Sequence, residues 1–221
     1  MIALLKAEVT AAGGDAKSAY ESLVARMAKT PEDATATALA RYATQIGRST
    51  DQVVADVAAA RDKEAKTAPD FELSSYTSDR KVSLRDFRGK VVLLTFWFPG
   101  CGPCRGEFPH LESVLTKFRG RDVVYLGING LTEQDAYVLP FMAGTKYSFT
   151  PLRADDKVCK PDAYNVKGYP SNFLIDREGR IVYRGFMIHG ENEILLQRMI
   201  ESLLAPPPAS AANAPASRPT R

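Results

Sequence analysis

The sequence predicts an α/β fold in which a mixed central sheet is flanked by helices and is preceded by a small all-helical segment. Between residues 69 and 204, apolar runs of strand length alternate with amphipathic segments of helical period. All ten Phe residues and the only Trp lie between Phe71 and Phe186, whereas the first 70 residues are rich in Ala. We therefore expect a helical segment at 1–68, an α/β domain at 69–204 and a tail at 205–221.

The helical segment carries apolar residues at helical spacing in three stretches, near Tyr20, Tyr42 and Val53. Ser49 and Gln52 fit a capping box, which marks a helix start. We expect three or four short helices, and we interpret them as a stabilising or dimerising extension rather than a dedicated binding module. The tail is rich in Ala, Pro and Ser, has little to bury, and is expected to be disordered.

Each element of the α/β domain follows from its local pattern. The run 91–98 is apolar throughout, as in a central strand that is covered on both faces. Pro109 is expected to kink its helix and Pro140 to interrupt its own. Further strands are expected at 71–73, 81–84, 123–128, 173–175 and 181–183, and helices at 102–118, 132–146, 157–164 and 191–204. This alternation implies a mixed sheet with helices on both faces.

The most informative motif is Cys101-Gly102-Pro103-Cys104, which follows the apolar run and opens an amphipathic segment. A cysteine in the first turn of a helix lies near unpaired N–H groups and the positive end of the helix dipole, which lower the pKa of its thiol. Cys101 is therefore the expected nucleophile. Cys104, one turn later, can attack the mixed disulfide and release the partner. Pro103 suits an early helical position, and Gly102 lets a partner's backbone approach.

A CxxC pair also occurs as half of a zinc site, which needs two further ligands. The chain offers Cys159, His110 and His189, and none of them stands in a zinc-knuckle spacing. We therefore favour redox chemistry at the thiols, with no metal and no cofactor. Cys159 is expected to be an inert thiol, with a third redox role as the alternative.

Composition and hydropathy argue against several classes of function. The formal net charge is +3 and the Lys and Arg residues are scattered, so no nucleic-acid partner is expected. No apolar stretch reaches the roughly 18 to 20 residues that span a bilayer, so we expect no membrane span in this chain. Lys6 and Glu8 interrupt the first apolar residues, so the chain as written shows no export signal. A longer exported precursor stays open.

Several motifs occur in order between about residues 69 and 204. They are Asp70-Phe71-Glu72-Leu73, Val82-Ser83-Leu84, Phe96-Trp97 before the CxxC motif, and Tyr164-Asn165-Val166 leading to Tyr169-Pro170-Ser171. This set resembles the TlpA/ResA-like branch of the thioredoxin-fold proteins, within the redoxin and AhpC/TSA group. The resemblance implies a thioredoxin-like fold and a thiol:disulfide oxidoreductase. It also implies disulfide-containing protein substrates, an upstream dithiol donor and an extracytoplasmic (periplasmic) location, with the cytoplasm as the alternative.

The resemblance further assigns roles to single residues. It implies that the Tyr169–Pro170 peptide bond is cis, that Pro170 faces Cys101, and that Tyr169 lines the substrate cleft. Glu107 matches a carboxylate that the ResA-like branch places near its thiols. A partly buried Glu has a raised pKa and can take the proton of the resolving thiol. The alternative for Glu107 is a solvated residue on the helix surface.

Two positions depart from the family pattern. Family members usually carry Trp immediately before the first cysteine, where this chain has Gly100, so we expect a more open cleft. Thioredoxin has a buried Asp just before its Phe-Trp pair, where this chain has Thr95, which cannot serve as a carboxylate base.

The Gly-Pro pair between the cysteines is that of thioredoxin, whose potential of about −270 mV favours a reductant. Two other functions stay as alternatives to a disulfide reductase. Thiol peroxidases of the redoxin group carry Thr or Ser three residues before the reactive cysteine, and position 98 here is Phe. A copper-binding module of the Sco-like kind usually spaces its cysteines one residue further apart, and His189 is in no evident register with this pair.

Overall fold

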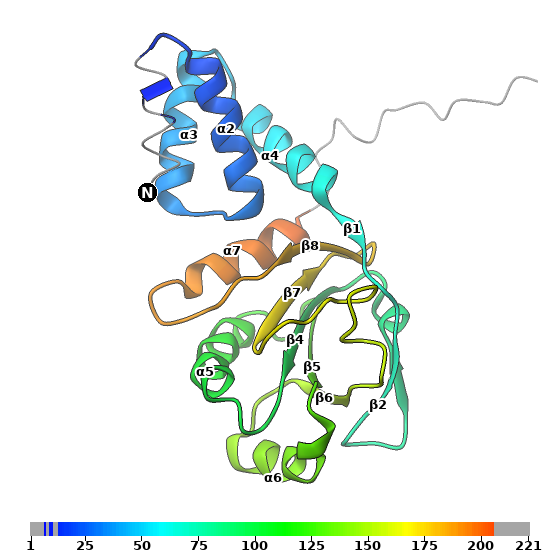
Figure 1. Cartoon of the computed structure of the whole chain (residues 1–221). Helices are drawn as coiled ribbons and strands as arrows, with labels where there is room; N and C mark the ends of the chain where they lie inside the picture. The colour runs from blue at the N-terminus through cyan, green and yellow to red at the C-terminus, as the bar shows by residue number, and fades with distance from the viewer. Residues whose placement is uncertain (1–6, 8, 11–12, 206–221) are drawn as a thin grey trace, which may run out of the picture. The chain divides into compact units, whose positions relative to one another are not determined.

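A computed structural model describes Ala7, residues 9–10 and residues 13–205, so the tail expected beyond Ala205 lies almost wholly outside the described residues. The chain divides into two compact units, with the first ending at Glu64 and the second running from Ala65 to Leu204 (Figure 1). This division falls a few residues before the boundary that composition suggests. It does so because Lys66 and Thr67 form a strand of the second unit's sheet.

The first unit is helical, as expected. Its described helices are α2 (Ala16–Lys29), α3 (Asp33–Gln45) and α4 (Thr50–Glu64). Tyr20 and Leu23 of α2 pack with Leu39 and Tyr42 of α3 in one apolar cluster. Ser49 forms the expected capping box, because its hydroxyl accepts from the Gln52 N–H and its own N–H donates to the Gln52 side chain.

The second unit is built on a six-stranded mixed sheet with the order β1-β8-β7-β4-β5-β6. Its strands are β1 (Lys66–Thr67), β8 (Arg180–Arg184), β7 (Ser171–Ile175), β4 (Val91–Trp97), β5 (Val123–Asn129) and β6 (Thr150–Arg153). β4, β5 and β6 run parallel, whereas β7 is antiparallel to β4 and to β8. Every residue of β4 is buried, as its continuous apolar run predicts.

The two faces of the sheet are covered differently. Helices α5 (Gly102–Thr116), α6 (Asp135–Thr145) and α7 (Glu193–Leu204) all contribute to the cluster that contains Trp97. The other cluster, around Phe96, is covered by the hairpin of β2 (Glu72–Ser74) and β3 (Lys81–Ser83), the 3₁₀ turn η1 (Leu84–Phe87) and the segment 154–166. No α-helix of the second unit contributes to this second cluster, so the sheet is flanked by helices as expected, but within this unit they lie on one face rather than on both.

The helix expected at 157–164 is absent, and this segment forms consecutive turns. Pro161 explains the difference, because it lacks an N–H in the middle of the segment and disfavours helical geometry at Lys160. The expected helix at 132–146 is split instead at its start, into a 3₁₀ turn η2 (Thr132–Gln134) and α6. Pro140 lies inside α6 without interrupting it. Strand β6 was not expected. It contains Pro151, which is tolerated because β6 is an edge strand.

Candidate active site

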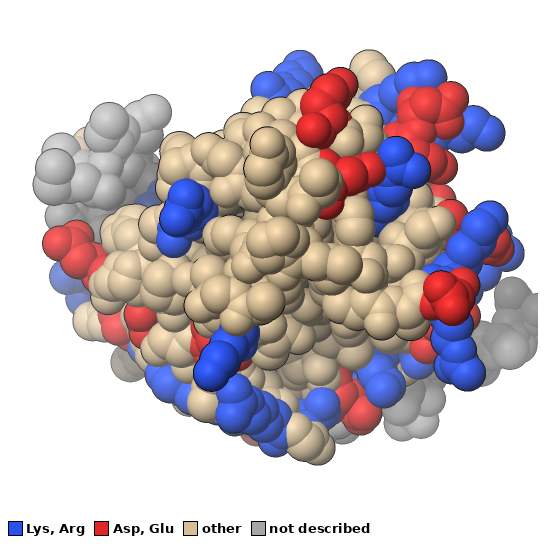
Figure 2. All heavy atoms as spheres, turned by 90° about the horizontal axis from the view of Figure 1, so that it is seen from below, with Lys and Arg blue, Asp and Glu red and all other residues tan. Residues whose placement is uncertain are grey.

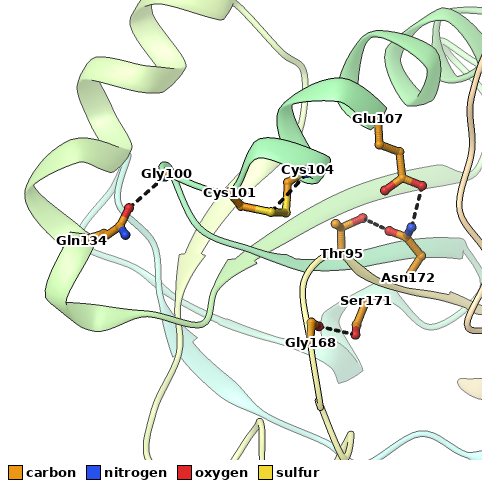
Figure 3. The surroundings of a disulfide bond; sticks show 9 residues. All are labelled: Thr95, Gly100, Cys101, Cys104, Glu107, Gln134, Gly168, Ser171 and Asn172. Atoms are coloured by element: carbon orange, nitrogen blue, oxygen red, sulfur yellow. Dashed lines mark hydrogen bonds between the residues drawn. A yellow bond between two sulfur atoms is a disulfide. The ribbon is translucent and has the colours of Figure 1, made fainter.

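The two cysteines of the CxxC motif lie where strand β4 passes into helix α5. Cys101 is the N-cap of α5 and forms a disulfide with Cys104, with the two Cα atoms 5.3 Å apart (Figure 3). The Cys101 Sγ accepts a hydrogen bond of 3.1 Å from the Cys104 N–H. Both side chains are buried, Cys101 with 2% of its surface exposed. An N–H group and a helix N-terminus thus face the Cys101 sulfur, and both stabilise negative charge there.

Gly102 and Pro103 occupy the first turn of α5 and are exposed. Pro103 also lines a groove beside the disulfide, whereas Gly102 does not. The groove has a volume of about 670 Å³ and continues along the segment from Tyr164 to Phe173. The Tyr169–Pro170 peptide bond is cis, which confirms that expectation, and both residues line the groove.

Tyr169 is held from three sides. Its ring packs edge-on against Phe98, with centroids 5.3 Å apart, and its hydroxyl reaches Gly130 and the Cys159 thiol. Burial, the Cys159 thiol and the charge of Glu133 together raise the pKa of Tyr169 to about 12. Tyr169 is therefore an uncharged wall of the groove at physiological pH.

Glu107 lies one turn after Cys104 on α5 and is only 2% exposed, so the alternative of a solvated surface residue is wrong. Its Oε1 accepts from the Asn172 amide at 2.8 Å and from the Ile188 N–H at 2.6 Å. Its Oε2 is buried and has no hydrogen-bond partner within the described part of the chain. Burial raises the pKa of Glu107, and the two hydrogen bonds and His110 oppose this only in part.

Asn172 connects Glu107 to the sheet, a role that sequence reasoning did not detect. It lies on β7 directly opposite Thr95 of β4, two residues after Pro170. Its Oδ1 accepts from the Thr95 hydroxyl at 2.7 Å, and its amide donates to Glu107 (Figure 3). The same amide also donates to the Phe186 carbonyl. Thr95 and Asn172 are both buried. The position that departs from thioredoxin therefore takes part in a buried polar chain that ends at Glu107.

Gln134 is a second residue that sequence reasoning missed. Its Oε1 accepts from the Gly100 N–H at 2.8 Å, which ties η2 to the loop just before Cys101 (Figure 3). A Cβ at position 100 would lie 2.9 Å from the same oxygen. Glycine at position 100 is the only local signal of this close approach, and the partner comes from a distant segment.

The remaining candidate residues lie apart from the disulfide chemistry. Cys159 is a free, half-buried thiol whose pKa is raised by burial. His110 pairs with Glu193 of α7 at 2.8 Å, and the backbone of His189 forms a turn with Asn192 before α7. Across the described residues, no three His, Cys, Asp or Glu side chains are grouped so that they could hold a metal ion.

Helix α6 presents an unusual surface next to the active-site loop. It follows Gln134 directly and contains a run of apolar and small residues, of which only Val138 is buried. Tyr137 is 63% exposed and Leu139 is 48% exposed. Figure 2 looks toward α6 from below and shows a broad area on this face without charged residues. No helix in the described part of the chain is long and apolar enough to cross a membrane.

The sequence profile of the AhpC/TSA family matches residues 65–184, which is more than half of the chain. The chain belongs to the AhpC/TSA family. This result agrees with the redoxin group that the motifs indicate, and the matched residues contain the disulfide, the cis peptide bond and all six strands of the sheet.

The chain is also similar to individual members of this group. It is 34% identical over 119 residues to the thiol-disulfide oxidoreductase ResA of Bacillus subtilis, a match that covers 54% of this chain and 65% of that relative. It is 34% identical over 134 residues to the thioredoxin-like protein YneN of Bacillus subtilis, covering 59% and 77% of the two chains. The chain thus spans slightly less than two thirds of ResA.

Solved structures agree with the fold. A crystal structure assigned as the thiol:disulfide interchange protein DsbE of Chlorobium tepidum is 33% identical, has a TM-score of 0.56, and is matched over 97% of its length and 64% of this chain. The thioredoxin-like α/β fold and the resemblance to the ResA-like proteins are therefore confirmed. The helical first unit lies outside the residues that the family profile matches.

Proposed function

We propose that this protein is a thiol:disulfide oxidoreductase that reduces disulfides of protein substrates through Cys101 and Cys104. The observation that carries this proposal is a disulfide at the N-terminus of α5, beside a groove whose wall contains the cis peptide bond at Pro170. The membership in the AhpC/TSA family and the names of the ResA relatives support the same chemistry.

The reaction balances as a transfer of two electrons from the dithiol to the substrate. The Cys101 thiolate attacks one sulfur of the substrate disulfide, a mixed disulfide forms, and the other substrate sulfur leaves as a thiolate that takes up a proton. Cys104 then attacks the Cys101 sulfur, and the second substrate sulfur leaves. The product is the Cys101–Cys104 disulfide, which a dithiol donor must reduce before the next cycle.

Glu107 is proposed as the base for the resolving step. Cys104 must lose its proton before it attacks, and a buried carboxyl of raised pKa one helical turn away can accept that proton. The unpartnered Oε2 leaves one side of the carboxyl open for this transfer. Pro170 and Tyr169, with Gly102 and Pro103 on the opposite side, are proposed to hold an extended substrate segment across the disulfide.

A protein substrate suits the surroundings of the site better than a small molecule does. The groove is open and about 670 Å³ in volume, and the uncharged face of α6 adds exposed apolar area beside Gly100. Exposed apolar surface next to a reactive site is typical of protein docking.

The proposal includes a location outside the cytoplasm, as the resemblance to the ResA-like branch implies. Fractionation of cells that express the tagged full-length gene product, against compartment markers, tests the location.

The decisive experiment is reduction of insulin disulfides by the purified protein with dithiothreitol as the electron source. The wild type and a Cys159→Ser control should be active, and Cys101→Ser should be inactive. Cys104→Ser should accumulate a mixed disulfide with the substrate. If the protein instead consumes hydrogen peroxide with thiol turnover and does not reduce insulin, the peroxidase alternative is correct and the proposal fails.

The direction of electron flow is tested separately by equilibration with glutathione. We expect a potential near the thioredoxin value of about −270 mV, because the Gly-Pro pair lies between the cysteines. A value above about −150 mV would make the protein an oxidant of its partners.

A further inference from the structure

The buried polar chain beneath the disulfide has a direction that the side chains themselves define. The Phe186 carbonyl can only accept, so the Asn172 amide nitrogen faces it and the Asn172 Oδ1 points the other way, where the Thr95 hydroxyl donates to it. That nitrogen has two hydrogens, and it donates one to Glu107 Oε1 at 2.8 Å and one to the Phe186 carbonyl at 3.1 Å. Both amide hydrogens and the Oδ1 atom of Asn172 are therefore hydrogen-bonded, and the residue is only 1% exposed.

A fixed amide donor beside a buried carboxyl favours the ionised form of that carboxyl. From the described residues Glu107 accepts two hydrogen bonds, and the second donor is the backbone N–H of Ile188, which no side-chain substitution removes. Asn172 is thus the one side chain in the described part of the protein that donates a hydrogen bond to Glu107. Its Oδ1 is held in turn by the Thr95 hydroxyl.

We propose that Asn172, oriented by Thr95, is a positioning residue that keeps Glu107 able to ionise in its buried place and so sets the pH range in which Cys104 resolves the mixed disulfide. The claim about the pH range of the resolving step rests on the proposed function. The ionisation of Glu107 itself does not depend on that function.

Other ionisable groups face Glu107 and must be held constant in any test. His110 follows on the same helix, lowers the pKa of Glu107, and is itself paired with Glu193 of α7. Burial holds the pKa of Tyr125 on β5 well above its ordinary value, and the charge of Glu107 raises it further. Cys101 and Cys104 titrate only in the reduced protein, so the oxidised protein isolates Glu107.

The first measurement is a carbon-13 NMR titration of the Glu107 carboxyl in the oxidised protein, with Glu107→Gln to assign the signal. Asn172→Leu removes the donor, and the titration midpoint should rise by about one to two pH units, as expected for the loss of a hydrogen bond to a charged group. Thr95→Val should raise it by less, and Thr95→Ser, which keeps the hydroxyl, should restore the wild-type midpoint. An unchanged midpoint in both Asn172→Leu and Thr95→Val overturns the proposal.

The second measurement links this ionisation to the reaction. The rate at which the reduced protein is oxidised by hydroxyethyl disulfide is followed from pH 5 to pH 9, and Asn172→Leu should move the rising limb to higher pH by the shift seen in the titration. In a Glu107→Gln background, Asn172→Leu should no longer move that limb. If the titration shifts and the rate profile does not, Asn172 still sets the ionisation of Glu107, and the proton-transfer part of the proposed function is wrong.

A different observation concerns the groove beside Pro170. Its lining includes two charged residues, Lys167 and Arg184, and no acidic residue. Both cations are exposed, and neither side chain has a hydrogen bond or an ion pair among the described residues. Arg184 lies opposite Phe173 at the end of β8, and Lys167 precedes the cis peptide bond, so the two cations come from separate elements.

We infer that the groove selects extended substrate segments that carry acidic side chains next to the reactive cysteine. This inference deepens the proposed function by naming its substrate class. Exposed ion pairs are individually weak, so two of them should change specificity by about three- to tenfold rather than abolish turnover. The preference should also fall as the salt concentration rises, because exposed charges are screened.

The test uses two disulfide-bonded peptides that differ only in having Glu or Lys on both sides of one cysteine. The wild type should show a several-fold higher kcat/KM for the Glu peptide, and Lys167→Glu or Arg184→Glu should reduce or reverse this preference. Lys90→Glu is the matched control, because Lys90 is exposed and lies just before the start of β4, away from the groove lining. Reduction of neutral hydroxyethyl disulfide should be equal in the wild type and in Lys90→Glu. The inference is overturned if the wild type reduces the two peptides equally well, or if Lys90→Glu changes the preference as much as Lys167→Glu and Arg184→Glu do. If the wild type does not reduce hydroxyethyl disulfide at all, the proposed function is contradicted instead.

Discussion

Replacement of Gly130 by Ala tests how the groove wall at Tyr169 is held in place. Gly130 follows β5, and its N–H donates to the Trp97 carbonyl at 2.9 Å. A Cβ built at this position would lie 2.6 Å from Cε1 and 2.7 Å from Cζ of the Tyr169 ring, and closer still to its hydroxyl. Real Cβ atoms essentially never approach within 3.0 Å, so the Tyr169 ring must move.

The size of the effect follows from what Tyr169 loses. If the ring stays, overpacking costs about 1–3 kcal/mol. If it swings away, it loses its edge-on contact with Phe98, which contributes about 0.5–1.5 kcal/mol, together with part of its burial. Because Ala has lower conformational entropy than Gly in the unfolded chain, the substitution also stabilises the folded state by about 0.4–1 kcal/mol. We therefore expect Gly130→Ala to destabilise the second unit by about 1–2 kcal/mol.

Urea unfolding followed by Trp fluorescence is the appropriate assay, because Trp97 is the only Trp and lies in the core of the second unit. Gly144→Ala is the control: nothing lies within 4 Å of a Cβ there, and helix propensity predicts a gain of about 0.5–1 kcal/mol. The KM for a protein disulfide should rise several-fold in Gly130→Ala only. If Gly130→Ala unfolds at the same urea concentration as Gly144→Ala and keeps the wild-type KM, a Cβ at position 130 does not displace the Tyr169 ring and the prediction is wrong.

Three further outcomes are expected. Because burial raises the pKa of Glu107 above its ordinary value of 4.5, the folded protein binds this proton more tightly than the unfolded chain does, and stability falls as pH rises from about 4.5 through the folded value. The unfolding free energies of the wild type and of Glu107→Gln should be measured between pH 4 and pH 8. The difference between them should change in favour of Glu107→Gln as the pH rises. If this difference is the same at every pH, the prediction is contradicted. Gln134→Ala removes the partner of the Gly100 N–H and should cost at most about 1.5 kcal/mol in urea unfolding, while raising the KM for insulin. In a Cys104→Ser variant, thiolate absorbance should show Cys101 ionising at lower pH than free cysteine, near 8.5; ionisation at or above that value would remove the basis for its role as nucleophile.

Features that depend on a few neighbouring residues could be predicted from the sequence. The placement of Cys101 at a helix N-terminus followed from an apolar run and a CxxC motif, and the buried strand β4 followed from its composition. The cis bond at Pro170 could be predicted only from the resemblance to a family, because most X-Pro bonds are trans. For Cys101 and β4 the relevant contacts lie within one turn or one strand.

Features that depend on contacts between distant segments could not be predicted. The Asn172–Glu107 bond joins residues 65 positions apart, and the Gly100–Gln134 bond joins residues 34 positions apart. No local pattern distinguishes Asn172 from an ordinary polar residue after a turn. The error at 157–164 has a different origin, because Pro161 lacks an N–H in the middle of the segment and disfavours helical geometry at Lys160.

The arrangement of Thr95, Asn172 and Glu107 has a simple electrostatic reason. A buried carboxylate is costly unless donors face it, and the interior beneath the disulfide supplies two donors, which both go to Glu107 Oε1. An acid at position 95, where thioredoxin has its Asp, would face the Asn172 Oδ1 and would either stay protonated or turn the amide away from Glu107. The uncharged hydroxyl of Thr95 avoids this conflict, because it donates to Oδ1 and leaves both amide hydrogens on the side of Glu107 and Phe186. A single buried acid on α5, rather than one on β4, is therefore the arrangement that this set of donors can support.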